Sequence, residues 1–173
     1  MKGTDKASPI TSFSRPLAAI LVVAVLLRAA AALYLGNSVE VLPGTFDQVS
    51  YHTLAMRVLG GHGFSFESAW WPMTAPGAPT AHWSFLYTLY LSAVYLLFGP
   101  NPVVARLIQA VIVGILHTWL AYRIGRHVFG ERAGLLAAAF TAVYIYFIYY
   151  AAALMPEPFY ITALMAALLM LLQ

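Results

Sequence analysis

The sequence predicts an all-α membrane protein that crosses the bilayer several times. Hydrophobic residues make up 62% of the 173-residue chain and charged residues only 9%, whereas a soluble domain is roughly 45–50% apolar. Long apolar segments alternate with short polar ones, and three of them reach the roughly 20 residues that a helix needs to cross the hydrocarbon core. We therefore expect a polytopic bundle of helices in lipid.

The charges and the cysteine count exclude two further classes of protein. The net charge is +3, but the basic residues are spread thinly and form no basic run. Loop charge beside membrane helices explains them better than nucleic-acid binding does. The chain has no cysteine, which excludes disulfides and thiolate chemistry.

The first predicted span is residues 16–35, PLAAILVVAVLLRAAAALYL, which follows a basic cytoplasmic tail at residues 1–15. A cleaved signal peptide is the alternative interpretation, because the apolar run ends in alanines. The run is longer than the usual roughly 7–15 apolar residues of a signal peptide, and Arg28 interrupts it. Both observations favour an uncleaved span.

Residues 36–101 form a long loop, rich in polar and aromatic residues, whose repeated glycines and prolines exclude one continuous helix. We expect two short juxtamembrane helices in it, at about residues 48–59 and at residues 83–98. The second would rise only about 24 Å as a helix, which is short of the roughly 30 Å hydrocarbon core. It is therefore predicted to lie at the membrane surface or to re-enter it, rather than to cross it.

Two full-length spans follow, at residues 102–122 and 133–154, and a basic loop at residues 123–132 joins them. If residues 83–98 do not cross the membrane, this loop lies on the same side as the N-terminal tail. The positive-inside rule prefers that arrangement. If residues 83–98 do cross, the basic loop faces outward instead.

The preferred topology brings two carboxylates into one compartment. The 36–101 loop, with Asp47, and a turn at residues 155–158, with Glu157 between two prolines, then both face outward. Under the other topology the two carboxylates would lie on opposite sides of the membrane. Residues 159–173 supply only part of a fourth span.

The ordered segments resemble one known family. A first span with a late arginine leads into FDQVSYHTLAMRVLGGHGF, then MTAPGAPTAHWSFLYTLYLSAVYLLFGPNPVVARLIQAVIVG, then YRIGRHVFGERAGLLAAAF and finally ALMPEPFYITALMAALLMLL. In this order they resemble the N-terminal region of GT-C fold glycosyltransferases, in the protein mannosyltransferase and aminoarabinose transferase group (glycosyltransferase family 39/83-like). The resemblance runs from about Leu27 to the last residue.

This resemblance implies a membrane enzyme that takes a sugar from a polyprenyl-phosphate-linked donor. The acceptor would be a hydroxyl or amine of a protein, lipid or glycan at the outer membrane face. The family has many more spans, so we expect this chain to be an N-terminal fragment that is inactive alone. We expect the plasma (inner) membrane of a bacterium rather than the endoplasmic reticulum.

The resemblance also implies four site residues. Asp47 matches the acidic residue of the first outer loop, which serves as the base or orients the acceptor, and Glu157 matches a second acidic position. Arg57 and Arg106 match basic residues near the lipid phosphate. Many relatives carry an Asp-Glu pair where this chain has Asp47-Gln48, and this departure weakens the case for adjacent carboxylates or a metal.

These groups suit the reaction on chemical grounds. A carboxylate beside the acceptor can orient it and accept its proton, and arginines can offer paired donors to the departing phosphate. We expect no cofactor apart from the lipid-linked donor. A divalent metal is not expected, because the loop histidines are too far apart in the sequence for a compact site: His52, His62 and His82.

Each site residue also has a purely structural interpretation. Asp47 could cap a helix, and Glu157 could be a solvated charge in an interfacial turn. The arginines could snorkel from helix ends to lipid headgroups: Arg28, Arg57 and Arg106. The loop tryptophans are expected to be interfacial anchors rather than sugar-stacking platforms: Trp70, Trp71 and Trp83.

A transporter or an assembly scaffold is the alternative function. Transporters tend to place polar groups and broken helices near the middle of the membrane. In this chain the polar residues concentrate in the long outer loop. That distribution favours an enzyme that works at the outer interface.

Overall fold

The computed structural model describes residues 15–43 and 45–173, so that of the predicted tail only Arg15 is described. The described residues form seven helices and no strand, apart from three isolated bridges in the loop region. This confirms the predicted all-α fold. The helices are α1 (Arg15–Leu35), α2 (Asp47–Leu59), α3 (Phe85–Phe98), α4 (Pro102–Phe129), α5 (Glu131–Val143), α6 (Ile145–Ala152) and α7 (Glu157–Leu171).

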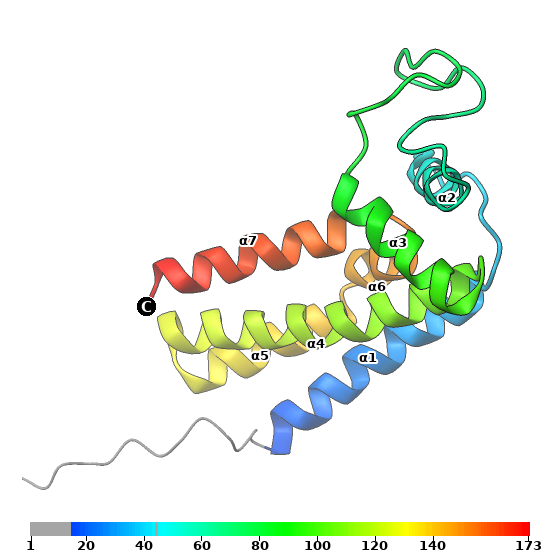
Figure 1. Cartoon of the computed structure of the whole chain (residues 1–173). Coiled ribbons are helices and arrows are strands. Elements are labelled where there is room, and N and C mark those ends of the chain that lie inside the picture. The colour runs from blue at the N-terminus through cyan, green and yellow to red at the C-terminus, as the bar shows by residue number, and fades with distance from the viewer. Residues whose placement is uncertain (1–14, 44) are drawn as a thin grey trace, which may run out of the picture.

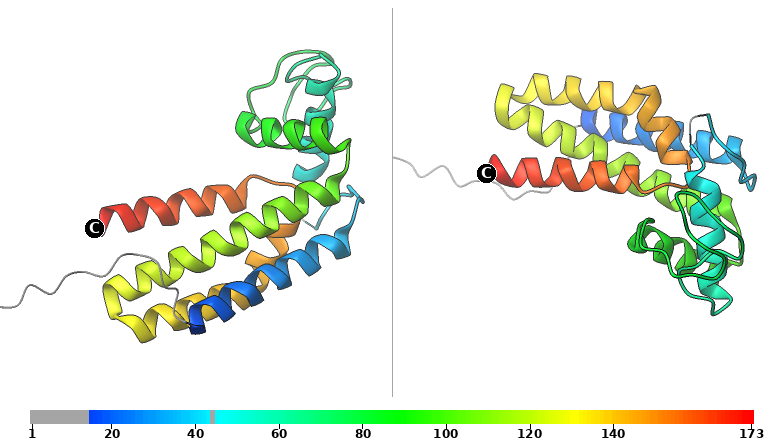
Figure 2. Two further views of the ribbon diagram at one scale, coloured as in Figure 1. Left: turned by 60° about the horizontal axis from the view of Figure 1, so that its bottom comes forward. Right: turned by 90° about the horizontal axis from the view of Figure 1, so that it is seen from above.

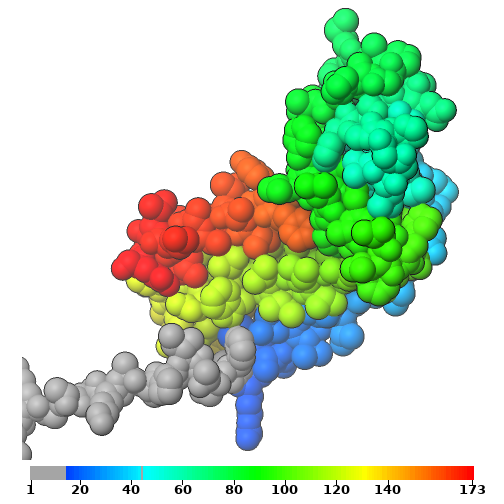
Figure 3. Space-filling model, viewed as in Figure 1, coloured from blue at the N-terminus to red at the C-terminus, as the bar shows by residue number. Residues whose placement is uncertain are grey.

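Four helices, α1, α4, α5 and α7, lie lengthwise in a bundle with α4 at its centre, where it contacts all the others (Figures 1 and 2). The loop region with α2 and α3 sits at one end, which we call the loop end, and stands out from the bundle (Figure 3). The opposite end, where α4 turns into α5, is called the hairpin end. The junction between α6 and α7 lies at the loop end (Figure 1).

Two helices are long and apolar enough to cross a membrane by themselves. They are α1, with 21 residues, and α4, with 28 residues. The pair α5 and α6 makes a third candidate span, although the two helices meet at an angle of 53°. Helices α3 and α7 are apolar but shorter. The chain therefore has the features of an integral membrane protein.

The basic segment 123–132, predicted as a loop, is helical on both sides of Gly130. Gly130 alone makes the turn, with a φ of 91° that favours glycine. Helices α4 and α5 then pack closely, because Gly134 has no side chain. A Cβ atom at Gly134 would lie 2.7 Å from the carbonyl oxygen of Tyr122. The helix therefore continues past residue 122, because a single glycine is enough to reverse the chain, and the predicted membrane boundary at residue 122 stays a prediction.

The predicted span 133–154 is not one straight helix. Tyr144 adopts an extended conformation, with φ −66° and ψ 116°, and separates α5 from α6. A helix end leaves carbonyl groups without intrahelical partners, and inside a membrane other protein groups must satisfy them. No glycine or proline marks the break, so the sequence did not predict it.

Arg28 of α1 supplies partners for the end of α5. It is completely buried, and its Nη1 donates to the carbonyl oxygen of Ala142 at 3.1 Å while Nη2 donates to that of Thr141 at 2.9 Å. Nη1 also donates to the carbonyl oxygen of Ala24 at 3.0 Å. Arg28 therefore does not snorkel to headgroups in this structure but caps a helix.

Gln109 of α4 does the same for the end of α6. Its Nε2 donates to the carbonyl oxygens of Tyr150, Ala151 and Ala153 at 3.3, 3.1 and 2.8 Å. Its Oε1 accepts from the hydroxyl of Tyr87 at 2.8 Å, which ties α3 to the same point. One amide thus holds three helices together at the loop end.

We expect the Gln109→Leu variant to lose about 2–4 kcal/mol of unfolding free energy, because a leucine fills similar space but leaves several buried carbonyls without donors. Thermal unfolding in nanodiscs measures this loss. Thr118→Val is the matched control: Thr118 is equally buried, and its hydroxyl has no partner among the described residues. An equal loss in both variants would contradict the capping role.

Because the loop end and the hairpin end lie at opposite ends of the bundle, cysteines placed at the two ends should differ in sidedness. The chain has no native cysteine to compete. We expect an impermeant thiol reagent on intact cells to label Ser68→Cys and Pro156→Cys. Arg132→Cys should be labelled only after the cells are permeabilised. Labelling of Arg132→Cys from outside would contradict the predicted topology.

Candidate functional site

Asp47 is the first residue of α2 and lies at the loop end. The N-cap of this helix is Phe46, which makes no side-chain cap hydrogen bond. The backbone N–H of Asp47 donates to the hydroxyl oxygen of Thr45 at 3.1 Å. Thr45 thus accepts the hydrogen bond of one N–H in the first turn of α2. The half-buried Asp47 carboxylate is therefore not needed as a helix cap and is available to bind a ligand.

Gln48, the residue beside Asp47, fixes this end of α2. It is 1% exposed, its Oε1 accepts from Arg106 Nη2 at 3.1 Å, and its Nε2 donates to the carbonyl oxygen of Glu40. A neutral amide can accept one bond and donate the other, whereas an ionised carboxylate can only accept. The departure from the Asp-Glu pair of relatives therefore has a structural use in this chain.

Glu157 begins α7, directly after the junction with α6. Pro156 and Pro158 fit here because the first N–H groups of a helix have no intrahelical partner to lose. His117 Nε2 donates to the carbonyl oxygen of Pro158 at 2.8 Å and holds this turn against α4. The Glu157 side chain is half-buried, and its Oε2 has no hydrogen-bond partner among the described residues.

The two carboxylates lie close enough to affect each other. Burial raises the pKa of Glu157 above its ordinary value; the Glu157 backbone N–H opposes this rise, and the charge of Asp47 adds a smaller increase. Burial also raises the pKa of Tyr51, one helical turn after Asp47, and the charges of both carboxylates add to this shift, while a hydrogen bond from the Ser84 backbone opposes it. The fold thus brings Asp47 and Glu157 together at the loop end.

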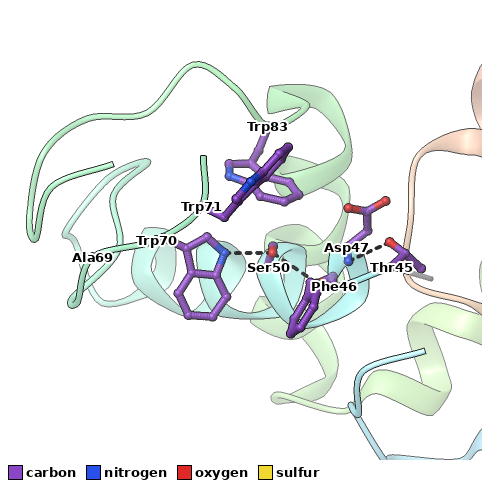
Figure 4. A pocket seen from close by; sticks show the side chains of 8 residues that line it. All are labelled: Thr45, Phe46, Asp47, Ser50, Ala69, Trp70, Trp71 and Trp83. Carbon is purple, nitrogen blue, oxygen red and sulfur yellow. Dashed lines mark hydrogen bonds between the residues drawn. The ribbon is translucent and has the colours of Figure 1, made fainter. Parts of the chain in front are cut away.

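A cavity of about 650 Å³ opens beside Asp47. We call it the aromatic cleft, and Figure 4 shows its indoles gathered over Ser50 with the Asp47 carboxylate at one end. Ser50 accepts a hydrogen bond from Trp70 Nε1 at 2.9 Å and donates to the carbonyl oxygen of Phe46 at 3.1 Å. The lining residues are Thr45, Phe46, Asp47, Ser50, Ala69, Trp70, Trp71 and Trp83.

A second cavity, of about 810 Å³, lies between α3 and α7 and has Glu157 in its wall. We call it the apolar groove, because most of its wall is aliphatic or aromatic. Trp83 lines the aromatic cleft and the next residue, Ser84, lines the apolar groove. The groove residues are Ser84, Leu86, Tyr87, Tyr90, Pro156, Glu157, Phe159, Tyr160 and Ala163.

The two predicted phosphate-binding arginines line neither cavity. Arg57 lies near the other end of α2, about 15 Å along the helix from Asp47, and donates to the backbone and hydroxyl oxygens of Ser65 at 3.3 and 3.2 Å. Arg106 is fully buried and donates to the carbonyl oxygens of Ser38 and Ala152 as well as to Gln48. Their predicted contact with a phosphate stays a prediction.

No metal-binding cluster of three or more His, Asp or Glu residues forms in residues 15–43 and 45–173. His52, one of the loop histidines, instead lies with its Nδ1 2.9 Å from the hydroxyl of Tyr95 on α3. This pair joins α2 to α3. The loop end therefore carries two carboxylates and two cavities.

Sequence reasoning missed several residues that line the cavities. Tyr87 and Tyr90 lie three residues apart on α3, a spacing that puts both on one helix face. Tyr51 lines neither cavity but packs against Trp83 of the cleft; it lies four residues after Asp47 and shares its face of α2 for the same reason. This spacing was visible in the sequence, but the partner helix was not.

Comparison with known proteins identifies the family. Residues 82–173, which include α3 to α7 and more than half of the chain, match the family model described as dolichyl-phosphate-mannose-protein mannosyltransferase. No curated protein and no solved structure matches the chain. The match includes Arg106 and Glu157 but not α2 with Asp47, and it confirms the predicted resemblance. The chain therefore belongs to the dolichyl-phosphate-mannose-protein mannosyltransferase family of membrane glycosyltransferases, which have the GT-C fold.

Proposed function

We propose that this protein transfers a sugar from a polyprenyl-phosphate-linked donor to an acceptor hydroxyl or amine at the outer membrane face. Membership of a glycosyltransferase family supports this over a transporter or scaffold. The observation that carries the proposal is that two cavities meet at the neighbouring residues Trp83 and Ser84, with Asp47 in the wall of the aromatic cleft and Glu157 in the wall of the apolar groove. The plasma membrane of a bacterium is part of this proposal.

The apolar groove suits the lipid end of the donor. Its two walls are α3 and α7, whose exposed side chains include Leu86 at 82% and Tyr160 at 64%. A polyprenyl chain could lie against them with its phosphate towards the loop end. The sugar would then reach the level of Glu157.

Asp47 is proposed as the base or the acceptor-orienting group. Its carboxylate is half-buried and lies at one end of the aromatic cleft. An acceptor hydroxyl in this cavity could donate its proton to Asp47 as it attacks the anomeric carbon. Glu157, whose pKa is raised by burial, would keep a proton to higher pH than an ordinary glutamate and hydrogen-bond the donor side.

Arg57 and Arg106 are proposed to act on the phosphate end of the donor in different ways. Arg57 is half-buried and, among the described residues, its guanidinium hydrogen-bonds only to Ser65, so it could turn towards a phosphate. Arg106 acts on the site indirectly, because its hydrogen bond to Gln48 holds the residue next to Asp47 in place. A positioning role therefore fits Arg106 better than direct contact.

We expect Asp47→Asn to lower transfer by about 10²–10⁴-fold, the usual contribution of a positioned general base, while the fold is retained. Membranes that contain the intact protein are incubated with labelled dolichyl-phosphate mannose, and label is counted in protein, lipid and glycan fractions. Glu67→Gln is the control, because Glu67 is an exposed carboxylate of the same loop. Full activity of Asp47→Asn would refute the assignment.

The raised pKa of Glu157 predicts a pH-dependent effect on stability. A carboxyl whose pKa is higher in the folded state than in the unfolded state favours folding at acid pH, and this contribution is lost as the pH rises through the folded value. Glu157→Gln resembles the protonated form, so it should be more stable than the wild type at about pH 8 and no more stable at about pH 4. Thermal unfolding across this range measures the difference.

Glu67→Gln removes an exposed carboxylate and should show no such crossover. If Glu157→Gln differs from the wild type by the same amount at both pH values, the carboxyl does not titrate differently in the folded state. The buried position proposed for Glu157 would then be incorrect.

A further inference from the structure

The aromatic cleft is built from rings whose positions are fixed. Trp70 stacks on Phe66 with ring centroids 4.7 Å apart and planes within 5° of each other, and its Nε1 is bonded to Ser50. Trp83 is 6% exposed and meets the ring of Tyr51 edge to face at 5.4 Å. Three of the four tryptophans of the chain therefore line one cavity, with two of them locked by packing.

Two groups of the cleft are not fully used by contacts within the protein: the N–H of Trp83 and the ring of Trp71. The indole Nε1 of Trp83 is buried and has no hydrogen-bond partner among the described residues. Trp71 is 69% exposed although it is a large aromatic residue, and it packs against His82 only edge to face at 5.0 Å. The exposed indole of Trp71 and the Asp47 carboxylate thus border one space, whose lining also includes Trp83 with its unpaired N–H (Figure 4).

This combination fits a pyranose ring. Such a ring has apolar C–H faces that pack on flat aromatic surfaces, and a rim of hydroxyl groups that both donate and accept hydrogen bonds. Trp71 offers an exposed aromatic face and Asp47 offers an acceptor, while Trp70 and Trp83 complete the aromatic wall. The volume of about 650 Å³ lies within the roughly 300–1,000 Å³ of small-molecule sites.

We propose that the aromatic cleft is the acceptor subsite of the enzyme and that it binds a pyranose ring, so that the acceptor is a saccharide. This inference rests on the proposed function. It differs from the interfacial role that the sequence suggested for these tryptophans, because Trp83 is buried and Trp70 is bonded within the protein rather than at a membrane surface.

The arrangement of the two cavities assigns the acceptor rather than the donor to the cleft. In a direct displacement, the acceptor oxygen forms a bond to the anomeric carbon while the bond from that carbon to the phosphate oxygen breaks. The electron pair leaves with the phosphate, and the acceptor proton goes to Asp47. Attack comes from the side opposite the phosphate, so the acceptor must occupy a different cavity from the lipid, which fits the apolar groove.

Intrinsic fluorescence tests this proposal without requiring transfer. Trp119 lies on α4 under Arg123, outside the cleft, so the Trp119→Phe variant of the full chain in nanodiscs retains only the three cleft indoles. We expect mannotriose or maltotriose to change this fluorescence in a saturable way. Adding Trp71→Ala should weaken saccharide binding by about tenfold or more, as for loss of one stacking partner, and Trp83→Phe should weaken it less.

Trp119→Phe alone should leave the saccharide affinity unchanged. Saturation-transfer NMR on the wild type measures that affinity for comparison and provides the matched control. Lack of a saturable signal with both saccharides would overturn the proposal. So would stronger binding of an acetylated, amidated Ala-Thr-Ala peptide, which would indicate a polypeptide acceptor. Competition by dolichyl-phosphate mannose would also overturn it, because the donor sugar would then occupy the cleft.

The result separates this proposal from the proposed function. Saccharide binding that is lost in Trp71→Ala, in a protein that shows no transfer from any polyprenyl-phosphate sugar, would refute the proposed reaction and leave a saccharide-binding cleft. Transfer that depends on Asp47 but is unaffected by Trp71→Ala would refute the acceptor subsite and leave the reaction.

Discussion

The structure depends on one constraint: a helix that ends inside an apolar bundle must have its last carbonyl groups satisfied by other side chains. The chain between residues 131 and 156 ends helices twice, after Val143 and after Ala152. Arg28 bonds the first set of carbonyls and Gln109 the second. Without these donors, the apolar segment would be more stable as a continuous helix. Helix α6 is short and bent away from α5, so α7 begins at the loop end. Glu157, the first residue of α7, therefore lies beside the first loop rather than deeper in the bundle.

The same constraint couples the bundle to the loop region. Arg106 joins the carbonyl oxygen of Ala152 at the end of α6 to that of Ser38 in the loop and to Gln48 of α2. Gln109 joins α6 to Tyr87 of α3. Both side chains come from α4 and lie one helical turn apart. The central helix therefore holds the loop, α2, α3 and the end of α6 in fixed positions relative to one another. A polar side chain in a membrane helix often indicates a ligand or ion pathway. Here, however, Arg106 and Gln109 donate hydrogen bonds to backbone carbonyl oxygens of neighbouring segments, and so hold the segments next to the two carboxylates in place.

The division of the loop end into two cavities gives the two carboxylates different surroundings. Asp47 faces a space with indole faces and an unpaired N–H donor, and Glu157 faces a space walled by aliphatic and phenolic side chains. A transferase that moves a sugar from a lipid has the same two needs, since one substrate is apolar over most of its length and the other is polar. The half-buried position of Glu157 raises its pKa above the ordinary value. The family assignment supports a membrane glycosyltransferase, and the two cavities provide separate places for the two substrates of the proposed reaction.

The sequence by itself determined the membrane class, the approximate positions of the helices, the short α3 and the family. The reason is that the length of an apolar segment and the order of its residues can be read directly from the sequence. It also singled out Asp47 and Glu157 through the ordered resemblance. Only the tertiary structure decided that residues 133–154 break at Tyr144, that Arg28 caps a helix and that Arg106 is buried under Gln48. The tryptophans gathered into a cleft in the same way, by contacts between distant segments. These features depend on which groups meet across the bundle, as Arg28 meets Thr141, and no local pattern of apolar and polar residues contains that information.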